Sequence, residues 1–85
     1  MRKLTEQDFT AIIGTVEHGY IIERARVKEG IYTDSDHYGI VLGRGEKEGL
    51  YVTWQFHLEG ETPTYYWGHY IADPEAALAD YETRS

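Results

Sequence analysis

The sequence predicts an α+β fold in a single domain that covers residues 1–85. We expect a helix, a four-stranded antiparallel meander and a second helix, with both helices on one sheet face. Three observations support this: apolar and polar residues alternate over residues 50–58, a capped helical pattern precedes the strands, and an Asp-Pro pair follows them. Because neither a sheet nor a helix buries its apolar side alone, one shared core is the economical arrangement.

The first helix is expected over residues 5–13. Thr5 is a suitable N-cap, and Asp8 stands at the third helical position, where a carboxylate completes a short version of the capping box. Phe9 and Ile12 recur at helical spacing and are expected to face the core. The pattern therefore predicts a short amphipathic helix with its polar side in solvent.

Four strands are expected to follow this helix. In residues 50–58, Val52, Trp54 and Phe56 should point into the core, because successive side chains of a strand face opposite sides of the sheet. The other three strands are expected over residues 20–28, 37–43 and 64–71.

The last helix is predicted to begin at Pro74, with Asp73 as its N-cap. Proline suits the first helical position because the N–H that it lacks would have no helical partner there. Ala77, Leu78 and Tyr81 make an apolar stripe at helical spacing, which predicts that this helix packs on the sheet.

Composition narrows the class of protein. Fifteen acidic and eight basic residues give a net charge of −7, which repels nucleic acid and anionic lipid at long range and favours a basic protein partner. The chain has no cysteine, so disulfides, thiolate metal sites and a cysteine nucleophile are excluded. The sequence shows neither a signal peptide nor an apolar run long enough to span a membrane, and we expect a cytoplasmic protein without membrane contact.

The tyrosines suggest a binding surface. Eight tyrosines are too many for one small core, and Tyr51 is expected on the free sheet face opposite Trp54. Gln55 and His57 should share that face, with Tyr66 beside them. Exposed aromatic residues are enriched at interfaces, so this face predicts a protein partner, of which a second copy forming a homodimer is one candidate. The competing interpretation, equally weighted, is that cross-strand aromatic pairs only stabilise a solvated sheet.

Basic residues support an alternative function. Arg24, Arg26 and Lys28 alternate on one strand face, and Arg44 is expected nearby. A basic stripe beside aromatic residues is one way in which a sheet binds single-stranded nucleic acid. The net charge disfavours nucleic acid, and a solvated ion-pair face accounts for the same residues.

A third alternative is a small hydrolase or metal-dependent enzyme centred on Asp34, Asp36 and His37. Ser35 and His37 lie close in sequence, but no recognised catalytic or metal-binding spacing is present. A metal site needs three or four converging ligands, and we see no pattern that supplies them. The sequence therefore predicts no catalytic residue, no metal and no cofactor.

Residues 37–43, 51–56 and 66–70 carry a resemblance to other proteins. The segments HYGIVLG, YVTWQF and YWGHY are similar to those of small proteins carried on bacterial conjugative (mobile) elements. The resemblance implies a cytoplasmic accessory protein, and such proteins include inhibitors of host nucleic-acid-processing or defence proteins, some of which imitate DNA charge. The basic residues Arg24, Arg26 and Lys28 depart from a DNA-mimic pattern. Our leading hypothesis is a non-catalytic, acidic protein-binding module.

Overall fold

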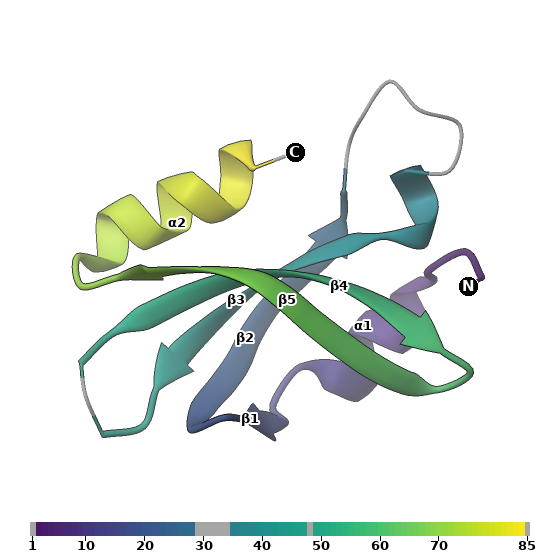
Figure 1. The fold of residues 1–85 in the computed structure, drawn as a ribbon, viewed down its shortest axis with the longest axis horizontal. Coiled ribbons are helices and arrows are strands. Elements are labelled where there is room, and N and C mark those ends of the chain that lie inside the picture. The colour runs from purple at the N-terminus through teal and green to yellow at the C-terminus, as the bar shows by residue number, and fades with distance from the viewer. Residues whose placement is uncertain (1, 29–34, 48, 85) are drawn as a thin grey trace.

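The computed structural model describes residues 2–28, 35–47 and 49–84. Its elements follow one another as a short helix, two strands, a 3-10 turn, three strands and a longer helix (Figure 1). They are α1 (Glu6–Ile12), β1 (Val16–Glu17), β2 (Tyr20–Val27), η1 (Ser35–His37), β3 (Gly39–Gly45), β4 (Tyr51–Glu59), β5 (Thr62–Ile71) and α2 (Pro74–Thr83).

The sheet has five antiparallel strands in the order β1-β2-β3-β4-β5 and curls into a half-barrel (Figure 1). The predicted four-stranded meander is therefore wrong by one strand. The additional strand, β1, pairs with the start of β2 through a two-residue turn at His18 and Gly19. Both turn residues have positive φ, 49° and 82°, as a tight primed hairpin turn requires. A two-residue strand is too short to show alternation in the sequence.

Helix α1 begins as predicted. Thr5 is its N-cap, and the Asp8 carboxylate accepts a hydrogen bond from the Thr5 backbone N–H at 2.8 Å, which completes the capping box. Arg2 pairs with the same carboxylate, with 2.6 Å between Nη2 and Oδ1. This hydrogen bond from Arg2 outweighs burial and holds the pKa of Asp8 below its ordinary value.

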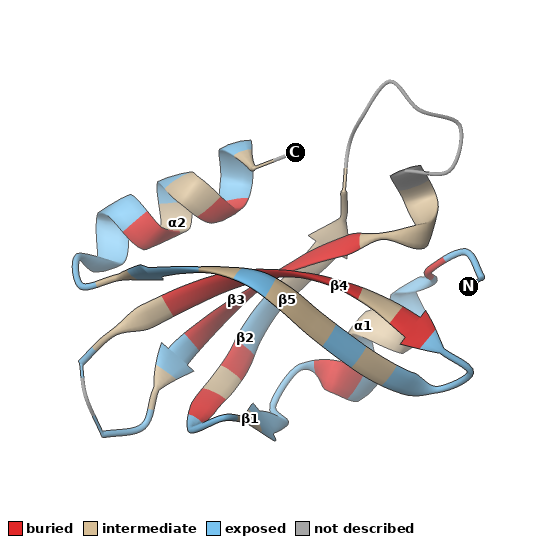
Figure 2. Cartoon of the chain, viewed as in Figure 1, coloured by how far each residue is buried: buried red, intermediate tan, exposed pale blue. Residues whose placement is uncertain are grey.

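The two helices lie on opposite faces of the sheet, which contradicts the prediction that they share one face (Figures 1 and 2). The reason lies in β3, where Ile40, Val41 and Leu42 are all buried. Val41 joins the core on the α1 side, whereas Ile40 and Leu42 pack against α2. A strand that is apolar on both faces needs cover on both, so one helix goes to each side.

Trp54 lies in the middle of the core on the α1 side. As predicted, Val52, Trp54 and Phe56 are buried there, with exposed fractions of 0 to 4%. The Trp54 ring has Tyr20 at 5.6 Å and Tyr65 at 5.4 Å between ring centroids. The register expected for β4 is therefore confirmed.

Two β-bulges change which side chains share a face. Glu23 is an extra residue in β2, because Ile22 pairs with Gly43 while Arg24 pairs with the adjacent Leu42. Ile22 and Ala25 therefore both face the α1-side core. Strict alternation over residues 20–28 predicts that Ile21 shares a face with Ala25 and Val27, and this prediction is wrong because one inserted residue reverses the alternation.

The second bulge lies in β5. Thr53 pairs with His69 and Gln55 with Tyr66, so two residues of β5, Trp67 and Gly68, stand opposite Trp54 alone. Bulges interrupt both long outer strands of the sheet, β2 and β5. Such interruptions discourage pairing with the edge of another sheet.

Candidate binding surface

Helix α2 covers only part of its sheet face. Ala77 and Tyr81 pack on Ile40 and Leu42 in a small second core. The N-cap is Asp73, as predicted, and its carboxylate accepts a hydrogen bond from the backbone N–H of Ala76 at 2.8 Å. The rest of this face is formed by side chains of β2, β4 and β5 that are linked by polar contacts, and they make up the candidate site.

A chain of hydrogen bonds crosses this open part of the face. The Lys28 ammonium donates to the Gln55 side-chain carbonyl at 2.9 Å, and the Gln55 amide donates to the Tyr66 hydroxyl at 3.0 Å. The Tyr66 hydroxyl lies 3.4 Å from His57 Nδ1, and His57 Nε2 lies 3.2 Å from the Glu59 carboxylate. If neutral His57 donates from Nε2, its Nδ1 accepts from Tyr66, so each link of this series of hydrogen bonds joins one donor to one acceptor. Burial raises the pKa of Tyr66, although the bond from Gln55 opposes this.

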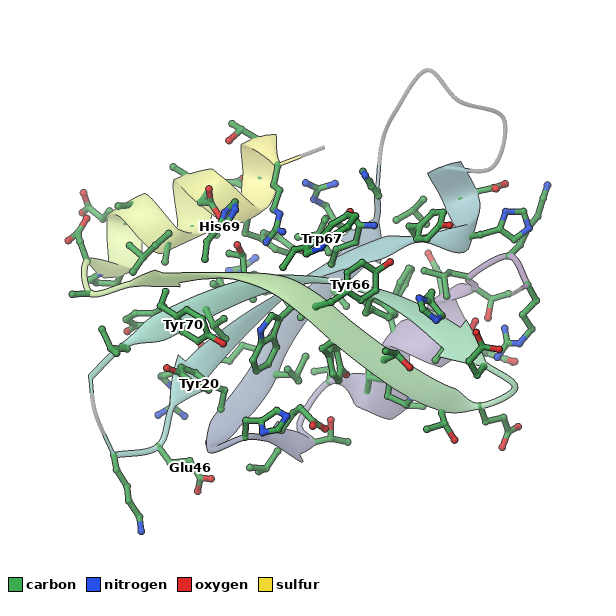
Figure 3. The ribbon with its side chains drawn as sticks, viewed as in Figure 1. Tyr20, Glu46, Tyr66, Trp67, His69 and Tyr70 are labelled. Atoms are coloured by element: carbon green, nitrogen blue, oxygen red, sulfur yellow. The ribbon has the colours of Figure 1, made fainter. Side chains whose placement is uncertain are left out.

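Four rings follow one another along the same surface, and we call them the aromatic row: Tyr38, His57, Tyr66 and Trp67. Their successive centroids are separated by 6.3, 5.5 and 4.9 Å. The Tyr66 and Trp67 rings are nearly perpendicular, at 85° (Figure 3). Edge-to-face pairs of this kind are favourable, so the row is an ordered surface.

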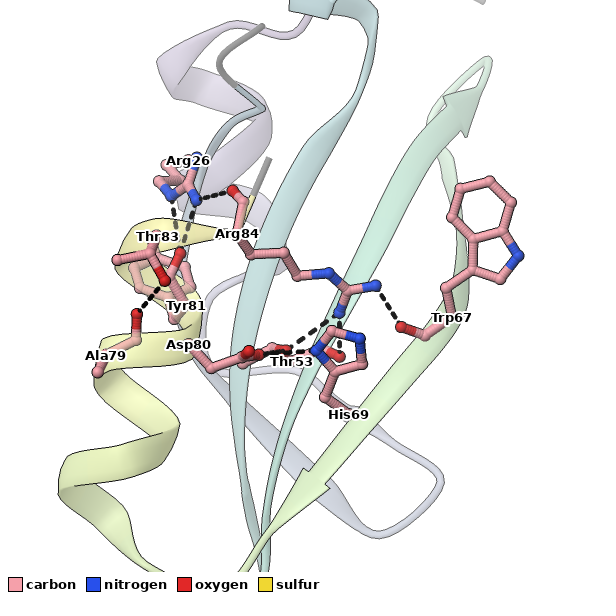
Figure 4. Close-up of polar contacts among 9 residues, drawn as sticks. All are labelled: Arg26, Thr53, Trp67, His69, Ala79, Asp80, Tyr81, Thr83 and Arg84. Carbon is pink, nitrogen blue, oxygen red and sulfur yellow. Dashed lines mark hydrogen bonds and ion pairs between the residues drawn. The ribbon is translucent and has the colours of Figure 1, made fainter.

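Trp67 is the unusual member of the row. The residue is 68% exposed, and its φ of 56° places it in the left-handed region, which is disfavoured for a bulky residue. Figure 4 shows the indole pointing away from His69 and Arg84. Trp67 therefore combines an unfavourable backbone conformation with a large apolar side chain that lies in solvent.

A polar network of Thr53, His69, Asp80 and Arg84 lies beside the row, between the sheet and α2 (Figure 4). The Asp80 carboxylate accepts from the Thr53 hydroxyl at 2.5 Å and contacts His69 Nδ1 at 2.9 Å. Burial opposes the charge of Asp80. The hydrogen bonds from Thr53 and His69 and the nearby charge of Arg84 outweigh burial and hold the pKa of Asp80 below its ordinary value.

Arg84 connects this network to the bulge. Its guanidinium donates to the Thr53 carbonyl at 2.7 Å, to the Thr53 hydroxyl at 3.0 Å and to the carbonyl of Trp67. Burial lowers the pKa of Arg84, although the charge of Asp80 raises it. Arg84 therefore bridges α2, β4 and β5.

The structure brings together three of the four residues predicted for protein binding. Gln55, His57 and Tyr66 contact one another, whereas Tyr51 lies at the far end of the face, half-buried with Ile71 against α2. Gln55 was expected to be free in solvent, but it is 5% exposed. The Gln55 side chain bonds Lys28 and Tyr66 in the open part of the face, whereas α2 packs against Tyr51.

Arg24 and Arg26 stand opposite Leu42 and Ile40 on the α2 side, as predicted for a shared strand face, but the basic residues of the alternative site are engaged in separate contacts. Arg26 donates to the carbonyls of Tyr81 and Arg84 at the end of α2, and its guanidinium lies 5.3 Å from the Tyr81 ring centroid. Arg44 pairs with Glu23 at 3.1 Å, and Lys28 bonds Gln55. Arg24 is exposed. Two of these residues, Arg26 and Lys28, support the fold and the candidate surface.

Trp67 is not one of the binding residues predicted from the sequence. The available signal was Gly68, because an isolated glycine within a strand pattern suggests a bulge or a close backbone approach. A Cβ at Gly68 would lie 2.7 Å from the Trp54 indole nitrogen. The bulge also separates Tyr66 from Tyr70, which contacts Tyr20 and Trp54 on the α1 side.

The proposed hydrolase or metal centre has little geometric support. Asp34 lies outside the described residues. Asp36 and His37 are 3.4 Å apart, but Asp36 also pairs with Lys3 at 3.2 Å. Within residues 2–28, 35–47 and 49–84, no group of three His, Cys, Asp or Glu side chains is placed to hold a metal.

Comparisons with protein-family models, curated proteins and solved structures found no match. Among the helices of the described ranges, none combines the length and apolar character needed to cross a bilayer.

Proposed function

We propose that this chain is a non-catalytic protein-binding module that contacts its partner through the aromatic row. The proposal rests on two properties of Trp67: the residue is 68% exposed, and its backbone φ is 56°. Tryptophan is among the residues that dominate binding energy at protein interfaces. Strained backbone tends to persist where surrounding contacts over-determine it, and it clusters at functional sites.

The chemistry of the surface indicates what a partner should bring. Within the described residues, the Trp67 indole N–H makes no hydrogen bond, and Lys28 adds a second donor group beside the rings. The nearby carboxylates of Glu59 and Asp80 are paired with His57 and His69. An apolar segment that carries hydrogen-bond acceptors is therefore the complementary partner surface.

Affinity capture from host lysate, quantified by mass spectrometry, tests this proposal. Trp67→Ala and Tyr66→Ala should reduce capture, and each should weaken binding of the captured protein by ~1–3 kcal/mol if it is a hot spot. Tyr70→Ala is the matched control, because Tyr70 is 57% exposed but contacts the α1-side core. Equal capture by the wild type and both row variants would overturn the proposal.

A second copy of the chain is another protein partner that an exposed aromatic surface fits. Analytical ultracentrifugation at several concentrations distinguishes this case. Self-association that Trp67→Ala abolishes and Tyr70→Ala leaves intact would identify the homodimer. A concentration-independent monomer would assign the row to a different protein.

Single-stranded nucleic acid is the second candidate, because Lys28 lies beside rings on which bases can stack. A nucleic-acid complex should weaken steeply with salt, roughly in proportion to the phosphates contacted. The net charge of −7 and the internal contacts of Arg26 favour the protein partner. Salt-sensitive binding of a single-stranded oligonucleotide, lost in an Arg24→Ala, Lys28→Ala double variant, would reverse this preference.

The resemblance to mobile-element proteins adds one class of partner to the protein-binding proposal. A host nucleic-acid-processing or defence protein is then the expected capture product. Inhibition of the captured protein by the wild type, but not by Trp67→Ala, would establish the regulatory role. A captured protein that has no nucleic-acid-processing or defence activity would contradict this regulatory role.

A further inference from the structure

The left-handed backbone of Trp67 and the next residue, Gly68, have contacts on both sides of the sheet. On the α2 side, Arg84 donates to the carbonyl of Trp67 (Figure 4). On the α1 side, Gly68 lies so close to the Trp54 ring that an added Cβ would stand 2.7 Å from the indole nitrogen. The peptide group between Trp67 and Gly68 is therefore confined between a guanidinium and an aromatic ring.

An arginine suits this position because its planar guanidinium presents several donors in fixed directions. One Arg84 nitrogen reaches both oxygens of Thr53 on β4, at 2.7 and 3.0 Å, and the other reaches the Trp67 carbonyl on β5. A lysine ammonium is a compact charge and does not reproduce a planar fork. The side chain thus bridges the two strands at the point where the bulge interrupts their pairing.

We infer that Arg84 is a positioning residue, which keeps Trp67 in its left-handed conformation and so directs the indole into solvent. The consequence for binding rests on the proposed function, whereas the consequence for the backbone does not. Arg84 is also the C-cap residue of α2, and its neighbour in the network, Asp80, lies on that helix. The packing of α2 and the exposure of Trp67 are therefore linked through the Arg84 side chain.

Solution NMR of the full chain tests the backbone effect without any partner. A residue with positive φ gives a strong intraresidue cross-relaxation peak between its amide and α protons, because the two protons are close. In the wild type, Trp67 should show this peak. Arg84→Met keeps the aliphatic stem but removes every donor, so the Trp67 peak should weaken and its indole N–H resonance should shift.

Arg26→Met is the matched control. Arg26 also holds the end of α2, through the Tyr81 carbonyl at 2.6 Å and the Arg84 carbonyl, but it makes no contact with Trp67. The Trp67 peak should survive in Arg26→Met. Retention of the peak in Arg84→Met, or equal loss in both variants, would overturn the inference, because Arg84 would then act only by docking α2.

A double-mutant cycle with Trp67→Gly keeps the inference testable if Arg84→Met alone folds poorly. Glycine adopts positive φ readily, so position 67 no longer needs to be held. Arg84→Met should then reduce the urea midpoint less in the Trp67→Gly background than in the wild type. Equal reductions in both backgrounds would contradict a positioning role. Failure of Trp67→Ala to affect partner capture would remove the proposed function and leave the NMR result standing.

Discussion

The two faces of β4 have opposite chemistry. On the α1 side, Val52, Trp54 and Phe56 contribute to a continuous apolar core. On the α2 side, Thr53 and Gln55 are 0% and 5% exposed, yet both are polar. Residues one position apart therefore build an apolar core and a buried polar layer. The α1 side therefore supplies most of the buried apolar residues, while the α2 side orients the groups around the aromatic row.

The polar side is stable only because its groups have partners. Thr53 donates to Asp80 and accepts from Arg84, and Gln55 bonds both Lys28 and Tyr66. A buried polar group that loses its hydrogen-bond partner destabilises the fold, because nothing then offsets the cost of removing that group from water. On the α1 side we therefore expect large losses of stability that depend on the side-chain volume removed. On the α2 side we expect smaller losses that depend on which hydrogen-bond partner is removed.

The largest effect is expected for Trp54→Ala. Trp54 is 4% exposed at the centre of the aromatic core, and truncation of such a side chain destabilises by ~3–5 kcal/mol. Trp67→Ala, the same substitution at an exposed position, should change the free energy of unfolding by less than about 0.5 kcal/mol. Urea denaturation followed by circular dichroism measures both. Similar losses would show that the apolar face is not the main source of stability.

Gly68→Ala should be the next most damaging change. The added methyl group would stand 2.7 Å from the Trp54 indole nitrogen and 2.9 Å from the Tyr70 ring, and overpacking of this kind costs about 1–3 kcal/mol. Urea denaturation should also show that Gly68→Ala costs less in a Trp54→Phe background, because the smaller ring leaves room. Additive losses would mean that the glycine is required for another reason.

Thr53→Val tests the polar face. Valine nearly matches threonine in shape, but it cannot donate to Asp80 or accept from Arg84, so we expect a loss of ~1–3 kcal/mol. Thr62→Val on β5 is the matched control, because Thr62 is exposed and should tolerate the change. Equal stability of the two variants in urea would show that the hydrogen bonds of Thr53 contribute nothing net.

Asp80→Asn should have a pH-dependent effect. The pKa of Asp80 is lowered in the folded protein, so its charged form stabilises the fold at pH values above its ordinary 3.8, and this contribution is lost as pH falls through the folded pKa. The variant should be less stable than the wild type by about 1 kcal/mol at neutral pH. The gap in urea denaturation should close in acid. A gap of constant size would assign the loss to packing.

Trp67→Gly should change stability in the opposite direction. Because a side chain in the left-handed region carries a cost, glycine there should leave the free energy of unfolding unchanged or raise it by about 1 kcal/mol. Partner capture should fall as it does for Trp67→Ala. A clear destabilisation in urea would show that the indole contributes to the fold.

Several features follow from local sequence. The caps at Thr5 and Asp73 need only the residues of the next turn, so both helix starts were predicted. The alternation in β4 placed Trp54 inward and brought Gln55 and His57 to one face, because a strand repeats every two residues. Tyr66 pairs with Gln55 on the neighbouring strand, but alternation alone allowed either Tyr66 or Tyr65 to share that face. Part of the candidate surface was therefore predictable from periodicity.

Other features depend on contacts between distant residues. The run Ile40-Val41-Leu42 indicates burial on both faces, but it does not say which helix covers which. The bulges at Glu23 and Trp67 depend on the partner strand, and each reverses the alternation beyond it.

The helix caps, the inward register of β4 and the excess of aromatic residues can all be predicted from the amino-acid order. Three other features depend on the folded arrangement: α2 packs against Tyr51, Arg26 caps α2, and Arg84 reaches the Trp67 carbonyl 17 residues away. The two groups differ in how far apart in the chain the interacting residues lie. Caps and alternation are set by neighbours within a turn or a strand, whereas a bulge and its exposed tryptophan exist only where two strands and a helix meet.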